Sequence, residues 1–190
     1  MRMKDEEKRT AIVEATIKLV NEIGFVSASV SKIAREADVS PATLYIYYKN
    51  KEDLLVSTYV EIKKLLSDAI LQDFNPEAPI RDILKKTWLN TFNFIQRHPS
   101  YIWFTEQFAN SPFGDLVDRE SVEKYFLPII EILNRGIDQK IIKNVPFDLL
   151  SVFTFYPVIL LTNPKLCKHF QATTENIELA FDLAWDAIKL

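Results

Sequence analysis

The sequence predicts an all-α fold, with an N-terminal three-helix, helix-turn-helix domain at residues 1–51 and a larger helical domain at residues 52–190. Only three of the 190 residues are glycine, and hairpin turns and phosphate-binding loops depend on glycine. Apolar residues recur at three- and four-residue steps along most of the chain, which is the pattern of amphipathic helices. Apolar types supply 48% of the residues, so the chain can bury a core, unlike a disordered sequence.

Three helices are predicted in the first 50 residues. The first covers residues 7–23, and Gly24 stands where a left-handed residue would end it. Ser29 is expected to cap a short second helix. A third helix is expected to begin at Pro41, because the Ser40 hydroxyl can accept a free amide hydrogen and proline is tolerated at the first helical position.

The rest of the chain is predicted to be helical, with short breaks. Asn50 is expected to cap the fourth helix, and the proline-containing segment 74–79 is the clearest linker, because proline disfavours helix in the residue before it. Further helices are expected over residues 51–71, 80–98, 99–110, 115–136, 146–161 and 174–190. Pro128 is expected to bend the helix over residues 115–136.

Charge and hydropathy favour a cytoplasmic protein with a basic first domain. The formal net charge is -3, which excludes a histone-like polycation. Residues 1–51 hold nine Lys and Arg against seven Asp and Glu, whereas residues 52–190 hold 14 against 19. No apolar signal segment follows the charged N-terminus. The longest apolar stretch, residues 147–161, is too short for a membrane span and is interrupted by Asp148 and Pro157.

Residues for catalysis or for binding a metal or cofactor are not evident in the sequence. The two histidines, His98 and His169, lie far apart and show no metal-ligand spacing. Cys167 is the only cysteine. Its lysine neighbours favour thiolate formation, but without a histidine partner an inert, partly buried thiol is the more common situation. We therefore expect no catalytic residues, no metal and no cofactor.

The arrangement of the first three helices is typical of a helix-turn-helix module, whose last helix can enter the major groove of DNA. Residues 24–55 also resemble the tetracycline-repressor (TetR) family of transcriptional regulators. The resemblance is carried, in order and without a gap, by Gly24-Phe25, Ser29-Val30, Ile33-Ala34, Ala37, Val39-Ser40, Thr43-Leu44-Tyr45, Tyr47 and Lys51-Glu52-Asp53-Leu54-Leu55. Three positions depart from the family pattern: Asp38 replaces the usual turn glycine, Ile46 occupies a site that is often polar, and Tyr48 replaces a common phenylalanine.

The resemblance implies specific roles for residues of this module. Those implied to hold the phosphate backbone of DNA are Ser29, Lys32, Tyr47 and Lys51. Those implied to face the groove are Ser40, Pro41, Ala42, Thr43 and Tyr45. Tyrosine hydroxyls can reach phosphate or base edges, and Thr43 can pack its methyl group on thymine. On composition alone, a tyrosine of a short amphipathic helix is more often part of the core, and we assign Tyr48 to the core.

For the larger domain the resemblance implies a small-molecule pocket and a dimer interface but transfers no residue. Candidates to line the pocket, each also a candidate for plain core packing, are Trp88, Thr91, Phe92, Trp103, Phe104, Gln107, Phe108, Tyr125 and Phe155. Segments 147–161 and 177–188 are more apolar than a single buried helix stripe requires, so we expect a four-helix dimer interface. Its candidate residues are Leu149, Val152, Phe153, Tyr156, Phe181, Ala184, Trp185 and Ile188.

Together these features predict a homodimeric, sequence-specific DNA-binding regulator. The expected partners are a double-stranded DNA operator and a small apolar or aromatic effector that releases a repressor from it, with no membrane partner. An alternative is a helical dimer that acts through protein-protein interaction or ligand sequestration and binds DNA only as an accessory activity. Asp38, Ala42 and the acidic pI of about 5.5 support that alternative.

Overall fold

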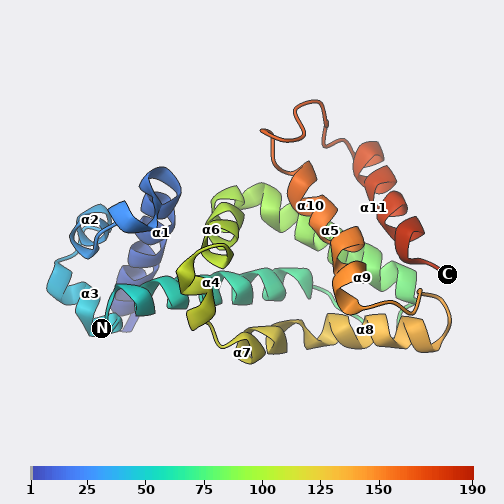
Figure 1. Cartoon of the computed structure of the whole chain (residues 1–190), viewed down its shortest axis with the longest axis horizontal. Helices are drawn as coiled ribbons and strands as arrows, with labels where there is room; N and C mark the ends of the chain where they lie inside the picture. Colours follow the sequence, from blue (N-terminus) through green and yellow to red (C-terminus); the bar gives the residue numbers. More distant parts are fainter. Residues whose placement is uncertain (1) are drawn as a thin grey trace. The chain divides into compact units, whose positions relative to one another are not determined.

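The structure is a computed structural model that describes residues 2–190, with side chains from residue 5 onward (Figure 1). Its elements in chain order are α1 (Arg2–Ser27), α2 (Val30–Glu36), α3 (Pro41–Tyr47), α4 (Lys51–Ile70), α5 (Ile80–Arg97), α6 (Pro99–Ala109), the 3-10 helix η1 (Pro112–Leu116), α7 (Arg119–Glu123), η2 (Lys124–Phe126), α8 (Leu127–Asp138), α9 (Phe147–Thr154), α10 (Tyr156–Leu161) and α11 (Thr174–Ile188). Extended pairing in the described residues is limited to one isolated bridge, between Ile142 and Lys189. The predicted all-α fold is confirmed.

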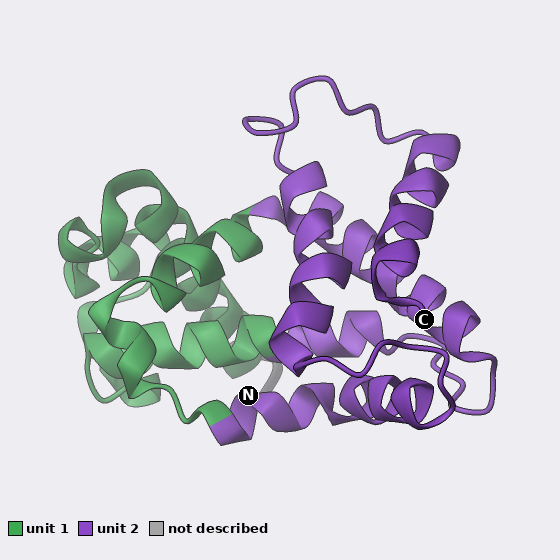
Figure 2. Ribbon diagram, turned by 45° about the vertical axis from the view of Figure 1, so that its right-hand side comes forward, with its two compact units in different colours: residues 1–63, 100–119 green, residues 64–99, 120–190 purple. Residues whose placement is uncertain are grey.

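The chain forms two compact units (Figure 2). Unit 1 runs up to Lys63 and also includes Ser100–Arg119, and unit 2 comprises Lys64–Pro99 and Glu120–Leu190. The sequence-based division at residues 51 and 52 therefore differs from the division by packing, because unit 1 contains the first part of α4, nearly all of α6 and η1 in addition to the three-helix module.

Two apolar clusters form the interior of unit 1. One holds the three-helix module together and consists of Ile12, Ala15, Ile33, Ala34, Ala37, Leu44, Tyr48 and Leu54. The other joins α1 and α4 to α6 and consists of Val13, Ile17, Val20, Ala28, Leu55, Ile62, Phe104 and Phe108. The predicted break at Gly24 is present, with φ 76° and ψ 166°. Phe25, directly after it, contacts the rings of Phe104, Phe108 and Phe113.

Polar side chains also attach α6 to α1. Asn21 donates from Nδ2 to the Ser100 carbonyl oxygen at 2.8 Å, and its Oδ1 accepts from Gln107 Nε2 at 2.9 Å. The Tyr101 hydroxyl donates to the Glu14 carboxylate. Burial, followed by the hydrogen bond and charge of Glu14, raises the pKa of Tyr101. These contacts explain why α6 belongs to the same unit as the three-helix module.

Unit 2 is built around α5, which contacts α8, α10 and α11. Trp88 is fully buried, stacks on Phe92, meets Phe181 edge-on and donates from Nε1 to the Thr154 carbonyl oxygen at 2.9 Å. Arg81 pairs with Asp182 at 2.7 Å across α5 and α11. This core of aromatic rings fixes the position of α11 in unit 2.

Two predicted helices are wrong in extent, and proline explains both. Residues 115–136 are divided among η1, α7, η2 and α8, and Pro128 lies in the first turn of α8 rather than at a bend. Residues 146–161 are likewise divided between α9 and α10, with Pro157 in the first turn of α10. Proline lacks an amide hydrogen and fits the first turn of a helix, so each proline begins a new helix.

Within the described residues, we find no helix that has both the length and the apolar character needed to cross a membrane.

Candidate nucleic-acid interface and effector-binding region

The turn between α2 and α3 is fixed by capping side chains. Ser29 Oγ accepts the Lys32 amide hydrogen bond at 3.3 Å at the start of α2, and Ser40 Oγ accepts that of Thr43 at 3.1 Å at the start of α3. Asp38 has φ 53°, a left-handed conformation that glycine adopts at less cost. The sequence prediction of both caps is confirmed, and the capped turn sets the orientation of α3.

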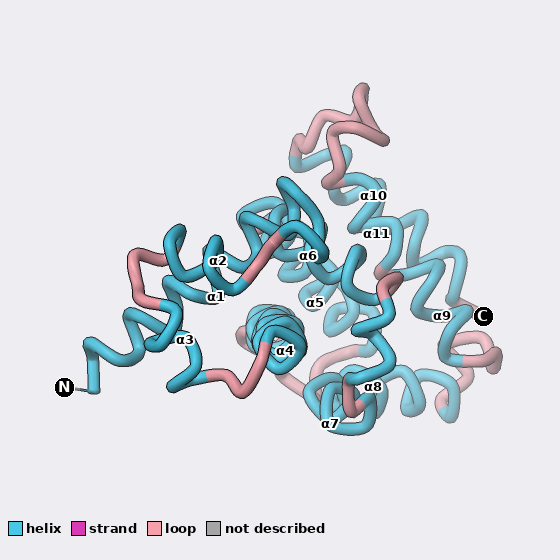
Figure 3. Tube along the Cα trace, turned by 60° about the vertical axis from the view of Figure 1, so that its left-hand side comes forward, coloured by secondary structure: helices cyan, strands magenta, loops and turns pink. Residues whose placement is uncertain are grey.

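Helix α3 is a short helix between two loop segments (Figure 3). Its residues divide into a buried and an exposed face. Leu44 and Tyr48 are buried in the cluster of the three-helix module. One face of α3 is therefore left uncovered by its own unit, and its side chains at Pro41, Ala42, Tyr45 and Ile46 are exposed. Thr43 is partly buried and shares a hydrogen bond of 2.9 Å with the Ser40 hydroxyl.

Two lysines predicted to contact phosphate keep their charge available. Lys32 Nζ donates to the Ser27 carbonyl oxygen at 3.1 Å, and Lys51 Nζ donates to the Phe25 carbonyl oxygen. Neither lysine forms an ion pair with a carboxylate among the described side chains. Because a carbonyl oxygen orients an ammonium group without neutralising it, both positions remain suited to an anion.

Tyr47 and Tyr48 are adjacent but lie in different surroundings. The Tyr47 hydroxyl donates to Asp5 Oδ1 at 3.2 Å, and desolvation together with the Asp5 charge raises its pKa. The Tyr48 hydroxyl is buried, and none of the described residues gives it a hydrogen bond of good geometry. Burial raises the pKa of Tyr48, while the nearby Arg9 guanidinium acts in the opposite direction. The structure therefore places Tyr48 in the core, as predicted, and leaves Tyr47 at the surface.

Ile46 is a surface residue that the sequence-based assignment of DNA contacts omits. Its side chain is 77% exposed and lies one helical turn after Ala42 on the same face of α3, next to Tyr45, which is 54% exposed. The sequence signal that would have identified it is its position out of phase with the buried pair Leu44 and Tyr48. A large β-branched side chain facing water on a short helix is a candidate contact residue.

The predicted effector-binding residues are distributed over both units. In unit 2, Trp88, Thr91 and Phe92 are buried in α5, whereas Tyr125 and Phe155 are partly buried. In unit 1, Phe104 and Phe108 are fully buried, Trp103 is partly buried and Gln107 is exposed. Ring stacking of Trp88 on Phe92, and of Phe104 on Phe108, shows that each pair contributes to the core of its own unit.

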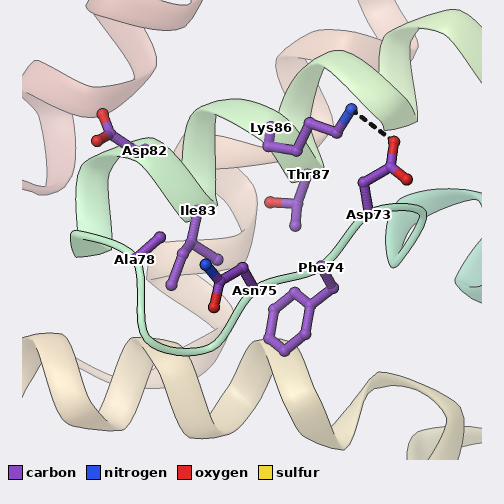
Figure 4. Close-up of a pocket in the computed structure, with 8 residues that line it drawn as sticks. All are labelled: Asp73, Phe74, Asn75, Ala78, Asp82, Ile83, Lys86 and Thr87. Atoms are coloured by element: carbon purple, nitrogen blue, oxygen red, sulfur yellow. Dashed lines mark hydrogen bonds and ion pairs between the residues drawn. The ribbon is translucent and has the colours of Figure 1, made fainter.

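A small hollow in unit 2 lies elsewhere. It has a volume of about 80 Å³ and is lined by Asp73, Phe74, Asn75, Ala78, Asp82, Ile83, Lys86 and Thr87 (Figure 4). It lies where the linker after α4 meets the first turns of α5, and an ion pair of 3.2 Å between Lys86 and Asp73 lies at its edge. None of the predicted effector-binding residues lines it. Small-molecule sites generally enclose several hundred Å³, so this hollow is too small for an effector.

The predicted dimer residues separate into exposed and buried sets. On α9 and α10, Leu149, Val152, Phe153 and Tyr156 are each about half exposed. On α11, however, Phe181, Ala184, Trp185 and Ile188 are buried inside unit 2. That helix instead exposes Leu179 and Leu183, at 57% and 64%. The most hydrophobic stripe of α11 is therefore used by its own chain, and a second apolar stripe faces outward.

Two protein-family models match the chain. Residues 12–58 match the model described as bacterial regulatory proteins, tetR family, and residues 79–189 match the tetracyclin repressor-like C-terminal domain. The first match covers α1 from Ile12 onward, α2, α3 and the start of α4. The second covers more than half of the chain.

Relatives and solved structures agree with these models. A fatty acid metabolism regulator protein of Bacillus subtilis strain 168 is 34% identical over 139 residues, 72% of each protein. The crystal structure of a TetR family transcription regulator from Marinobacter aquaeolei VT8 is 38% identical, covers 100% of this chain and 99% of that one, and has a TM-score of 0.89. A transcriptional regulator FadR from Bacillus subtilis, solved in complex with stearoyl-CoA, shares the fold at 20% identity and a TM-score of 0.73, over 94% of this chain and 97% of that one.

Proposed function

The chain belongs to the TetR family of transcriptional regulators, and on that premise we propose that it is a cytoplasmic, homodimeric repressor that binds its operator through α3 and leaves it when an effector with a long apolar chain binds. The observation that carries the DNA-binding part is the exposed face of α3 together with two unpaired lysines, Lys32 and Lys51. Helix-turn-helix proteins place such a face in the major groove and hold the adjoining phosphates with cations.

We propose two sets of DNA contacts, one to the edges of the bases and one to the phosphates of the backbone. Ser40, Pro41, Ala42, Thr43 and Tyr45 are proposed to approach base edges. Ile46 is added to this set because its side chain is 77% exposed. Ser29, Lys32, Tyr47 and Lys51 are proposed to hold phosphates. Lys51 also begins α4, where the helix dipole and free amide hydrogens favour an anion.

Exposed apolar side chains of α9, α10 and α11 are proposed to form the dimer interface. Each chain would contribute Leu149, Val152, Phe153 and Tyr156 together with Leu179 and Leu183, which replace the buried α11 residues of the sequence-based set. α9 and α11 contact each other within unit 2, and we propose that their exposed side chains belong to one surface. Two copies of this surface, related by a two-fold axis, would form a four-helix interface.

The relatives support an effector with an acyl chain. The Bacillus subtilis relative, 34% identical, is named for fatty acid metabolism, and the structural neighbour FadR holds stearoyl-CoA. α4 runs without interruption from unit 1 into unit 2, and α6 is attached to α1 by three side-chain hydrogen bonds. We propose that these helices have two arrangements, one that binds the operator and one that does not. The effector can lower operator affinity only to the extent that it binds the second arrangement more tightly than the first.

Selection from a randomised duplex library tests the proposal. The full-length protein is expected to enrich one two-fold symmetric sequence in moderate salt. Thr43→Ala and Tyr45→Phe are expected to alter the enriched bases more than the affinity for non-specific duplex. Failure to enrich any sequence would contradict operator recognition and favour ligand sequestration. Equal losses on every duplex would contradict base reading by these two residues.

A further inference from the structure

Lys63 lies in α4 and combines two features, the lack of a carboxylate partner and an aromatic neighbour. Several other lysines of the helices pair with carboxylates, as do Lys18 with Glu36, Lys85 with Glu178 and Lys86 with Asp73. Among the described residues no carboxylate pairs with Lys63.

The sequence of α4 makes this isolation understandable. Side chains that could reach Lys63 along the helix are three and four positions away, and they are Tyr59, Val60, Leu66 and Ser67. None of them carries a negative charge. The carboxylate closest in sequence, Glu61, pairs with Arg9 at 2.9 Å.

An aromatic wall lies beside the Lys63 ammonium group. Its Nζ atom is 5.4 Å from the centre of the Tyr59 ring, within the range of a cation-π contact. Tyr59 in turn stacks on Phe108 of α6, with ring centres 4.6 Å apart. Phe108 is fully buried and holds the Tyr59 ring in place, whereas Tyr59 and Lys63 are only partly buried. The Tyr59 ring and the Lys63 ammonium group therefore form a small amphipathic surface, apolar at one end and positive at the other.

The surroundings of this cation are poor in water, although the residue retains some accessible surface. Lys63 is only partly buried as a residue. Desolvation nevertheless lowers the pKa of its ammonium group. A charge in such a setting is stabilised strongly by an opposite charge, because the effective dielectric constant is below that of water.

We propose that Lys63 binds the anionic head group of the effector, a carboxylate or a phosphate, while the ring of Tyr59 contacts the adjoining apolar chain. This inference rests on the proposed function, since it specifies the chemistry of the effector. It adds that the effector is an amphiphilic anion rather than a neutral apolar or aromatic molecule.

Isothermal titration calorimetry of the full-length protein tests this with three probes that share one chain length: decanoate, decanoyl-CoA and decan-1-ol. Lys63→Met is expected to weaken binding of at least one anionic probe by about tenfold and to leave decan-1-ol unchanged. Lys63→Arg should retain most of the affinity. Lys64→Met, which removes the exposed lysine next in sequence, should bind all three probes as the wild type does.

The probes also distinguish the possible outcomes. A loss confined to decanoate identifies a carboxylate site, and a loss confined to decanoyl-CoA identifies a phosphate site. Equal losses for all three probes, or no loss for either anion, would overturn the role of Lys63 and leave the apolar effector of the proposed function intact. Binding of no probe to the wild type would overturn the amphiphilic anion itself, whereas library selection tests DNA binding separately.

Discussion

Two surfaces of this protein leave large apolar side chains in water, and the charges around them differ. The exposed face of α3 carries Tyr45 and Ile46, and lysine or arginine residues occur in α2 and just after α3. The exposed faces of α9 and α11 carry more apolar residues, yet α9, α10 and α11 contain no lysine or arginine. A polyanion requires cations, whereas a second copy of the same apolar surface does not. On this difference we propose that DNA binds the first surface and that a second copy of the chain binds the second.

The largest expected effect comes from placing a charge on the second surface. A symmetric dimer would carry the substitution Leu183→Glu or Phe153→Glu in both chains. Each variant would therefore bury two unpaired carboxylates in the interface. We expect each variant to weaken dimerisation by about 3 kcal/mol or more. Sedimentation velocity at micromolar concentration measures this, with circular dichroism to show that the fold is retained. A folded variant that remains fully dimeric would show that α9 and α11 do not form the interface.

A smaller effect is expected when a cation of the first surface is removed. Lys51→Met should weaken binding to every duplex alike and reduce the slope of log affinity against log salt by about one unit for each chain of the dimer. Salt titrations by fluorescence anisotropy measure this slope. Lys168→Met, an exposed lysine after α10, serves as the control and should leave the slope unchanged. The same slope for Lys51→Met as for wild type would refute the phosphate contact.

Ile46 offers a finer test of what the apolar part of α3 recognises. We expect Ile46→Ala to lose about fivefold in affinity, about 1 kcal/mol, on the selected duplex, because its side chain packs on a thymine methyl group. Replacing thymine by uracil removes only that methyl group. On the uracil duplex the variant and the wild type should bind equally, and a persisting difference would show that Ile46 contacts something else.

The smallest expected effect concerns the turn before α3. Asp38→Gly should raise the free energy of unfolding by about 1 kcal/mol, because it relieves a positive φ of 53°. It should also tighten DNA binding by removing a negative charge near phosphate. Asp38→Asn removes the charge alone and should tighten binding with a smaller gain in stability. Urea unfolding and anisotropy give the two values, and unchanged stability in the glycine variant would show that the turn is not strained.

The two surfaces also differ in how far the sequence predicts them. Caps at Ser29 and Ser40 and the proline that begins α3 are local signals, since each depends on atoms within three residues. These local signals predict where α2 and α3 begin, and the phase of the apolar residues in α3 then predicts which of its faces is exposed. Ile46 is missed because its role depends on exposure rather than on a motif.

In α11 no local signal separates core from surface. Phe181 and Leu183 are two residues apart and equally apolar, yet one is fully buried and the other is 64% exposed. Which stripe faces the core depends on α5, whose Trp88 and Arg81 both contact Phe181. Lys63 is similar, because its isolation from carboxylates is visible in the sequence but its contact with an aromatic wall is not. Packing between distant segments decides these positions.

We propose that two copies of α3, held by a symmetric dimer, read successive faces of one duplex. The most direct test measures the affinity of the full-length protein for selected half-sites whose centres are moved apart one base pair at a time. We expect one preferred spacing, with half-sites about 34 to 36 Å apart or a multiple of it, and a steep loss of affinity when five base pairs are inserted. Affinity that does not change with spacing would contradict this proposal.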